Sequence, residues 1–167
     1  HLKVKFQPID WSMSITELRN GTIDLLWNGL TINPSRQQKI DFSQPYLANQ
    51  QVLIVKKSQQ ITSPQQMAGK TLGVQTGSAG SFALEQKPQV LKQYIKDQTP
   101  VSYDTFTNAF LDLNANRIQG LLGDNVYAEY YLKHQAHPEN YLVLPLAFPT
   151  EYYGVGIKKG EQTLVAK

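Results

Sequence analysis

The sequence predicts an α/β fold with mainly parallel sheets. Short apolar runs rich in β-branched residues alternate with amphipathic segments along the whole chain. The sequence also contains an internal repeat. When the chain is aligned with a shifted copy of itself, three pairs of apolar residues coincide: Leu18 with Leu113, Ile23 with Ile118, and Leu26 with Leu121. In both copies the end of a helix leads directly into a strand, which indicates two similar lobes. Two unrelated αβ units would give the same match, and that alternative stays open.

The first third of the chain contains four expected elements. The run at residues 4–9 predicts a strand, with a proline near its end. Residues 14–20 predict a short helix, because the glycine that follows is a natural helix stop. Residues 23–27 predict a buried apolar strand. Residues 51–55, Gln-Val-Leu-Ile-Val, predict another strand because the run is apolar and β-branched.

The rest of the chain continues the alternation. Ser63 followed by Pro64 predicts the start of a helix, since serine caps helices and proline suits the first helical position. A strand is expected at 71–75 and a helix at 81–86. Residues 102–114 predict a helix, because their apolar side chains fall on one face. The remaining expected elements are a strand at 118–122, a helix at 125–134 and an extended segment at 141–146.

The composition excludes several classes of protein. The 167 residues are 41% hydrophobic, carry a net charge of +3 without a basic run and contain no cysteine. This argues against a nucleic-acid-binding protein, and it excludes disulfides and cysteine-bound metals. No apolar stretch is long enough to span a membrane. The chain begins with His1 and has no signal-peptide pattern, so we expect a processed or trimmed piece of a longer protein.

Residues 24–36 predict the floor of a pocket for a small carboxylate. The apolar strand stops at Asn28 and Gly29, and Gly29 lets the backbone turn outward. Thr31 then offers a hydroxyl, and Arg36 offers a planar set of donors that matches a carboxylate with two parallel hydrogen bonds. The alternative for Arg36 is an ordinary ion pair on the surface.

A second group of residues complements the first. Residues 73–81 form a strand, a turn of small residues and a helix start, which is a typical anion site, and Ser78 adds a hydroxyl. Asp124 ends a later strand and is suited to bind a cation. Arg36 and Thr31 together with Asp124 would match the α-carboxylate and α-ammonium of an amino acid. The alternative for Asp124 is the N-cap of the following helix.

The known catalytic motifs do not fit. Residues 69–71 resemble the end of a phosphate-binding loop, but Pro64 stands where that motif requires glycine. The turn around Ser78 matches neither a dinucleotide fingerprint nor a nucleophile elbow. His134 and His137 lack an evident third metal ligand nearby, and we expect them at a solvated helix end. We therefore expect binding rather than catalysis, with no cofactor and no metal.

The chain resembles a known family, the type II periplasmic solute-binding proteins of polar amino-acid ABC transporters. Its motifs occur in family order over nearly the whole chain. They are the aromatic residue after Ile9-Asp10, the loop 28–32 with Arg36, the segments 40–43 and 45–46, the turn 73–78, the segment 117–120 and the segment 153–160. The resemblance implies a two-lobed fold, each lobe a mainly parallel sheet flanked by helices, and two hinge strands.

The resemblance also implies roles for individual residues. The residue that matches Arg36 binds the ligand carboxylate, helped by the hydroxyl that matches Thr31. Backbone N–H groups of the turn that matches Ser78 and Ala79 bind the same carboxylate.

The remaining site residues surround the rest of the ligand. The positions that receive the ammonium match Gly29 and Asp124. Asn28, next to Gly29, is also a candidate ligand-binding residue. Trp11 matches an aromatic residue that stacks on the ligand side chain, although it could instead be ordinary core. Gln75 lines the side-chain pocket, and Tyr46 is a candidate wall.

The implied lobes are residues 1–50 with 158–167 and residues 56–151, joined by hinge strands at 51–55 and 152–157. Elements that the family has at both ends are missing here, so lobe 1 is expected to be incomplete. The implied function is to bind a polar L-amino acid in the interlobe cleft and deliver it to a membrane ABC permease, as an extracytoplasmic monomer. A sensor domain of the same fold, and a dehydratase acting on a carboxylic acid, remain alternatives.

Overall fold

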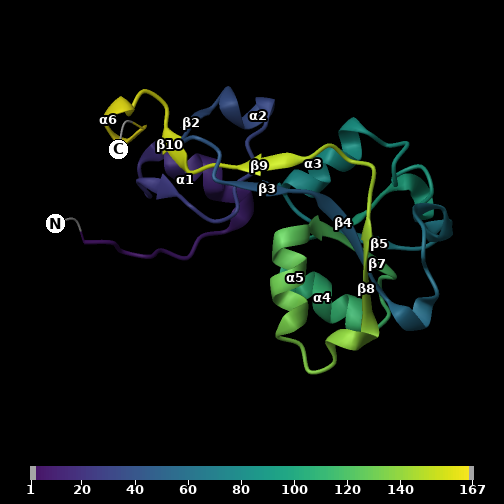
Figure 1. Ribbon diagram of the computed structural model, residues 1–167. Coiled ribbons are helices and arrows are strands. Elements are labelled where there is room, and N and C mark those ends of the chain that lie inside the picture. Colours follow the sequence, from purple (N-terminus) through teal and green to yellow (C-terminus); the bar gives the residue numbers. More distant parts are fainter. Residues whose placement is uncertain (1–2, 166–167) are drawn as a thin grey trace. The chain divides into compact units, whose positions relative to one another are not determined.

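The computed structural model describes residues 3–165, without the side chains of Gln162 and Val165. The chain forms two compact units. Unit 1 contains His1–Ala48 and Glu151–Lys167, and unit 2 contains Asn49–Thr150. Each unit combines a sheet with helices, so the expected α/β fold with two lobes is confirmed (Figure 1).

Unit 1 contains short elements from both ends of the chain. These are η1 (Trp11–Met13), α1 (Ser14–Asn20), β1 (Leu25–Leu26), α2 (Pro34–Gln37), β2 (Ile40–Phe42), β9 (Glu151–Tyr153), β10 (Gly156–Lys158) and α6 (Gln162–Val165). Strand β3 (Leu47–Asn49) crosses the boundary between the units and pairs with β9.

The sheet of unit 1 has the order β1-β10-β2, and both ladders are antiparallel. The expectation of a mainly parallel sheet is therefore wrong for the described part of this unit. Strands β1 and β2 run in the same direction and are joined through α2, as the local alternation indicates. The late strand β10 inserts between them in the opposite direction, and such an insertion cannot be deduced from neighbouring residues.

A small core supports this sheet. Its buried side chains are Leu18 of α1, Leu26 of β1, Leu30 of the following loop and Ile40 of β2.

The strand expected at 4–9 is wrong, because residues 3–10 adopt no regular element and the Phe6 side chain is 89% exposed. A strand needs a neighbour to satisfy its backbone groups, and the sheet of unit 1 does not extend to these residues.

Unit 2 is continuous in sequence. Its strands are β4 (Gln51–Lys56), β5 (Leu72–Gln75), β6 (Val101–Tyr103), β7 (Gly120–Asp124) and β8 (Tyr141–Pro145). Its α-helices are α3 (Ala79–Gln86), α4 (Phe106–Asn114) and α5 (Asn125–Lys133). Its 3₁₀ helices are η2 (Lys57–Gln59), η3 (Pro64–Met67), η4 (Lys96–Gln98) and η5 (Pro138–Asn140).

The five strands of unit 2 have the order β6-β5-β7-β4-β8. Strand β5 is parallel to β6 and β7, whereas β4 is antiparallel to β7 and β8. The sheet is therefore mixed. In the register of β4 and β7, Gln51 lies opposite Asp124, which places the first residue of one strand beside the last residue of the other.

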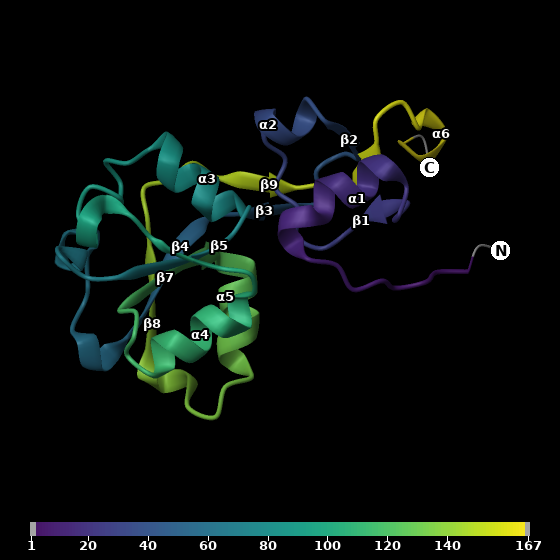
Figure 2. The same ribbon diagram turned by 180° about the vertical axis from the view of Figure 1, so that it is seen from behind.

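Helices cover both faces of this sheet. Val52 and Ile54 of β4 pack with residues of α4 and α5, such as Phe110 and Ala128. Leu53 and Val55 point to the other face, where they join a core that includes Leu84 of α3. Figure 2 shows α4 and α5 side by side, with α3 apart from them. The continuous apolar sequence of β4 is explained by burial on both faces.

The chain passes between the units at residues 48–49 and 150–151. The expected hinge strands at 51–55 and 152–157 begin within a few residues of these positions, and their role as a hinge stays a prediction. Residues 51–55 form an interior strand of the unit 2 sheet, and Gly156–Lys158 forms the middle strand of the unit 1 sheet.

The start of α4 also differs from the expectation. Residues 101–103 form strand β6, and the helix begins only at Phe106. Thr105 is its N-cap, and its Oγ accepts a hydrogen bond of 3.1 Å from the backbone N–H of Asn108. The helix expected at Ser63 exists as the 3₁₀ helix η3, with Pro64 in the first helical turn and a capping box between Ser63 and Gln66.

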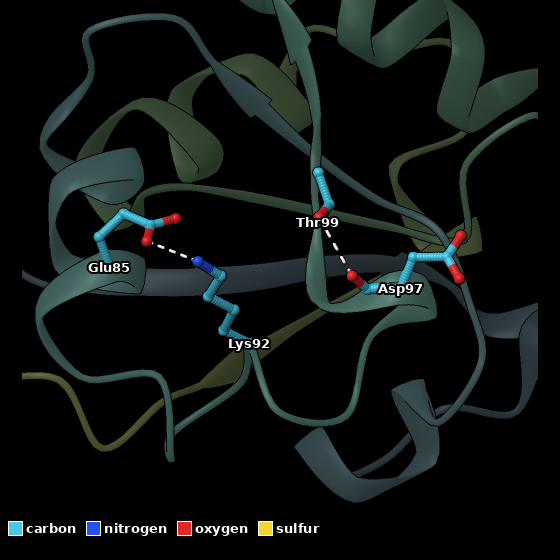
Figure 3. Close-up of polar contacts among 4 residues, drawn as sticks. All are labelled: Glu85, Lys92, Asp97 and Thr99. Carbon is cyan, nitrogen blue, oxygen red and sulfur yellow. Dashed lines mark hydrogen bonds and ion pairs between the residues drawn. The ribbon is translucent and has the colours of Figure 1, made fainter.

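Polar contacts fasten the loops of unit 2. Lys92 forms an ion pair of 2.5 Å with Glu85 near the end of α3 (Figure 3). In the turn before β6, the hydroxyl of Thr99 donates to the carbonyl oxygen of Asp97 over 3.1 Å (Figure 3). Because the Glu85 side chain is 55% exposed, its ion pair contributes little to stability.

A second polar network joins β6 to α4. The Tyr103 hydroxyl donates to Asp112 Oδ2 over 2.8 Å, and Arg117 Nη1 donates to Asp112 Oδ1 over 2.7 Å. Burial, followed by the hydrogen bond to Asp112 and its negative charge, raises the pKa of Tyr103 to about 12. The hydrogen bonds from Arg117 and Tyr103 lower the pKa of Asp112 below its ordinary value.

Candidate functional site

Arg36 is buried in unit 1 and held in a fixed orientation. It lies in α2, where Asn33 Oδ1 accepts a hydrogen bond of 2.9 Å from the Arg36 backbone N–H. Its side chain is 8% exposed, and Nη1 donates to the carbonyl oxygen of Thr31 over 2.8 Å. The side chain is therefore buried rather than exposed on the surface. The bond to Thr31 orients a guanidinium whose geometry suits a carboxylate.

Trp11 lies beside this guanidinium. The distance from Arg36 Cζ to the centroid of the Trp11 ring is 5.8 Å, which is within the range of a cation–π interaction. Trp11 is half-buried and also packs against the core of unit 1. Trp11 is therefore in part an ordinary core residue, as the alternative proposed. Its ring also lies against Arg36, the residue expected to bind the carboxylate.

The loop around Gly29 runs beside β9. Gly29 has a φ of +58°, a conformation that favours glycine, and a Cβ there would lie 3.5 Å from the Tyr153 ring. Thr31 forms an isolated β-bridge with Tyr153, and its hydroxyl donates to Glu151 Oε2 over 3.1 Å. The side chain of Asn28 is exposed. The predicted loop thus lies next to β9, a segment from the other end of the chain.

Tyr46 belongs to a group of aromatic side chains in unit 1. Its ring centroid lies 6.3 Å from that of Trp27 in an edge-on arrangement, and 6.3 Å from that of Tyr153. Tyr46 is 45% exposed and Trp27 is 69% exposed, whereas Tyr153 is buried. The group therefore presents an accessible apolar surface beside Gly29, which fits the expected role of Tyr46 as a wall.

In unit 2, the predicted turn between β5 and α3 has the expected form. Gly77 has a φ of +68°, and Ser78 is the N-cap of α3, with its Oγ accepting a hydrogen bond of 3.1 Å from Ser81 N–H. Ala79 is buried at the first helical position. Gln75 Nε2 donates to the carbonyl oxygen of Asp104 over 3.1 Å, so its amide is directed toward the segment after β6. The turn thus ends at a helix N-terminus, where the serine hydroxyl caps the helix, and its role as an anion site stays a prediction.

Asp124 ends β7 and precedes α5. It occupies the N-cap position, but its side chain makes no capping hydrogen bond to that helix. Instead, Asp124 Oδ1 accepts a hydrogen bond of 2.6 Å from Gln51 Nε2. The capping alternative therefore describes the position of this residue but not the direction of its carboxylate.

Sequence reasoning missed three contributors. Glu151 contacts the Thr31 hydroxyl, Tyr153 packs over Gly29, and Gln51 contacts Asp124. Gln51 was identified only as part of an apolar strand, although a polar residue at the start of an otherwise apolar run is itself a signal. Glu151 and Tyr153 lie far from the loop in sequence, and only the pairing of distant segments brings them to it.

His134 and His137 each contact a nearby acceptor on the surface. His134 Nδ1 contacts the carbonyl oxygen of Tyr130 at 2.7 Å, and His137 Nδ1 contacts Glu139 at 3.1 Å, all on the surface. Among the described residues, no group of three or more His, Asp or Glu side chains is placed to hold a metal ion. Within the same residues, no helix has the length and apolar character needed to cross a membrane.

Comparison with known proteins gives the family. The family model for bacterial extracellular solute-binding proteins, family 3, matches residues 1–167. The chain belongs to this family. The expected resemblance is therefore confirmed.

Solved and curated relatives agree with this assignment. A crystal structure of an ABC uptake transporter substrate-binding protein from Streptococcus pneumoniae, with bound histidine, matches with a TM-score of 0.96 and 44% identity, over 99% of this chain and 67% of that one. The ABC transporter arginine-binding protein 1 of Escherichia coli is 31% identical over 86% of this chain and 55% of its own length. A probable histidine-binding protein of Neisseria gonorrhoeae is 28% identical over 99% of this chain and 60% of its own length.

The chain thus spans little more than half the length of these curated relatives. The named relatives are binding proteins rather than enzymes, and the family is extracellular.

Proposed function

We propose that this chain binds a polar L-amino acid and belongs to an extracytoplasmic, monomeric binding component that delivers the amino acid to an ABC permease. The observation that carries the proposal is the buried guanidinium of Arg36, oriented by the Thr31 carbonyl and flanked by Trp11. The planar guanidinium can form two parallel hydrogen bonds with a carboxylate, and the α-carboxylate of an amino acid has that geometry.

The ammonium group is assigned to Asp124. Its carboxylate makes no capping hydrogen bond to α5 and accepts one from Gln51, and an anion at that point complements a ligand cation. Backbone N–H groups of the turn at Ser78 and Ala79 would add donors to the ligand carboxylate. Gly29, with Asn28 beside it, is assigned a contact to the ammonium, and Tyr46, Trp11 and Gln75 would line the ligand side chain.

The proposal involves no chemical step on the ligand. The named relatives bind histidine or arginine, so those amino acids lead the choice of ligand, followed by glutamine and cystine.

The test is isothermal titration calorimetry with L-histidine, L-arginine, L-glutamine and L-cystine, accompanied by thermal unfolding. A ligand at a hundredfold excess over Kd stabilises the native state by about 2.7 kcal/mol, which gives a measurable rise in Tm. Arg36→Ala leaves a ligand carboxylate unpaired, and we expect it to weaken binding by about 100-fold or more. Arg36→Lys should also weaken binding, because lysine cannot form the bidentate pair.

Arg117→Ala is the matched control. Arg117 is also an arginine paired to a neighbour, but its side chain is 71% exposed and lies in the network of Tyr103 and Asp112. We expect this variant to bind the amino acid like the unmodified protein. Wild-type protein that binds none of the four amino acids, or an Arg36→Ala variant with unchanged affinity, would refute the proposal.

A further inference from the structure

The first turn of α5 is capped from another strand. The backbone N–H of Asn125 donates to the carbonyl oxygen of Gln50 over 2.9 Å, and that of Val126 donates to Asn49 Oδ1 over 3.3 Å. An aspartate at the N-cap position ordinarily accepts bonds of this kind with its own side chain. Here the segment before β4 takes that role, and the Asp124 carboxylate is not needed for it.

Gln51 contacts that carboxylate directly. It lies opposite Asp124 in the ladder of β4 and β7, and its Nε2 donates to Oδ1 over 2.6 Å. The Gln51 side chain is completely buried. A buried amide is costly unless its polar atoms are bonded, and the next four residues of β4 are all apolar. A polar side chain at this one position therefore requires a purpose.

The start of α3 confines the same side chain. A Cβ added to Gly80 would lie 2.6 Å from Gln51 Oε1 and 3.4 Å from Leu122 Cγ. Glycine at this position therefore leaves the space that the amide occupies. Gln51 is thus fixed by packing on one side and by Asp124 on the other, which limits the orientations open to the carboxylate.

We infer that Gln51 is a positioning residue that holds the Asp124 carboxylate in the direction needed to bind the ligand ammonium. The inference rests on the proposed function. A neutral amide orients a carboxylate without cancelling its charge, whereas a lysine or arginine at this position would compete with the ligand cation. The hydrogen bond also removes rotational freedom from the carboxylate before the ligand arrives, which lowers the cost of binding.

Gln51→Met tests the inference, because methionine has a similar volume but no amide. The ligand pairs are L-histidine with 3-(imidazol-4-yl)propionate and L-arginine with 5-guanidinopentanoate, which lack only the ammonium. We expect Gln51→Met to weaken binding of the amino acid that the wild type binds by about 10- to 100-fold, the value of a hydrogen bond to a charged group. Binding of the corresponding analogue without the ammonium should be unchanged.

A double-mutant cycle separates positioning from general damage. Asp124→Asn should weaken amino-acid binding, and adding Gln51→Met to it should have little further effect, because the two residues act through one contact. Glu85→Gln is the control for Asp124→Asn, since it also removes a carboxylate from unit 2, but an exposed one paired with Lys92 (Figure 3). It should bind normally.

Gly80→Ala provides a second route if Gln51→Met does not fold. Its added methyl group displaces the flexible end of Gln51, and we expect the same selective loss of affinity for the amino acid. Equal losses for the amino acid and its analogue, or additive losses in the cycle, would overturn the positioning role while leaving the proposed function intact. If the wild type binds no amino acid, the proposed function fails first.

Discussion

The guanidinium carbon of Arg36 lies 5.8 Å from the centroid of the Trp11 ring. Trp11 begins the short helix η1, whereas Arg36 lies in α2 after the loop that contains Thr31. The ring therefore packs against the cation that we assign to the ligand carboxylate. A change at Trp11 should act on binding through Arg36 as well as through direct contact with the ligand.

Trp11→Leu should lower the affinity for the amino acid. A cation–π interaction contributes about 0.5–2 kcal/mol, so we expect a loss of roughly 3- to 30-fold in titration calorimetry. Trp11→Phe keeps an aromatic face and should recover part of the affinity. Identical Kd values for the leucine and phenylalanine variants would indicate that the ring acts only as core.

Ser78→Ala should reduce both stability and binding. The hydroxyl of Ser78 caps α3, and loss of an N-cap costs about 1 kcal/mol in the free energy of unfolding. Thr105→Ala is the matched control, because Thr105 caps α4 with the same geometry and has no assigned role in binding. Urea unfolding should give similar losses for the two variants, and only Ser78→Ala should raise Kd. A parallel rise in both would attribute the effect to stability.

Tyr103 should titrate late. Burial and the contact with Asp112 raise its pKa from 10.0 to about 12. The raised pKa means that the folded state prefers the protonated phenol, so this contribution to stability is complete below pH 10 and is lost as the pH rises toward 12. Ultraviolet absorbance of the phenolate, compared between the wild type and Tyr103→Phe, measures this ionisation. The ionisation that the wild type has and Tyr103→Phe lacks is that of Tyr103. If this ionisation occurs near pH 10 rather than near pH 12, the prediction is contradicted.

Gly123→Ala should destabilise unit 2. A Cβ at this position would clash with Cε2 of the Phe106 ring and would lie 2.7 Å from its Cζ. Overpacking of this kind costs about 1–3 kcal/mol in the free energy of unfolding, measured by urea titration. The same substitution in a Phe106→Leu background should cost clearly less, because the smaller side chain leaves room for the methyl group. Equal costs in both backgrounds would show that the ring is not the obstacle.

The sequence predicted most of the elements of unit 2, because they are local. A signal within a few residues was enough to predict the Gly-rich turn before α3, the helix after Asp124 and the apolar strand β4. Unit 1 was harder to predict. Its middle strand, β10, comes from the opposite end of the chain, and residues 4–9 have strand composition without a partner in the described sheet.

For the candidate site too, local features could be predicted and contacts between distant segments could not. Arg36, Thr31 and Asp124 were identified from residue type and position at strand ends, and the structure describes a buried guanidinium and a strand-end carboxylate there. Glu151 could not be identified, because its contact joins residues that are distant in sequence, and Gln51 was marked only by its polar side chain at the start of an apolar run. Hydrogen bonding between distant segments depends on strand register, which composition does not encode.

The position of β10 has a consequence for the order in which the chain assembles. Unit 2 is one continuous stretch, so it has all of its strands as soon as residue 150 has been synthesised. Unit 1 begins earlier in the sequence, but β1 and β2 have no common ladder until β10 is available to pair with both. During synthesis β1 and β2 therefore emerge before unit 2, but the ladders that join them through β10 form only after it. Until then the two strands lack β10 as a partner for their backbone groups, which leaves them open to aggregation.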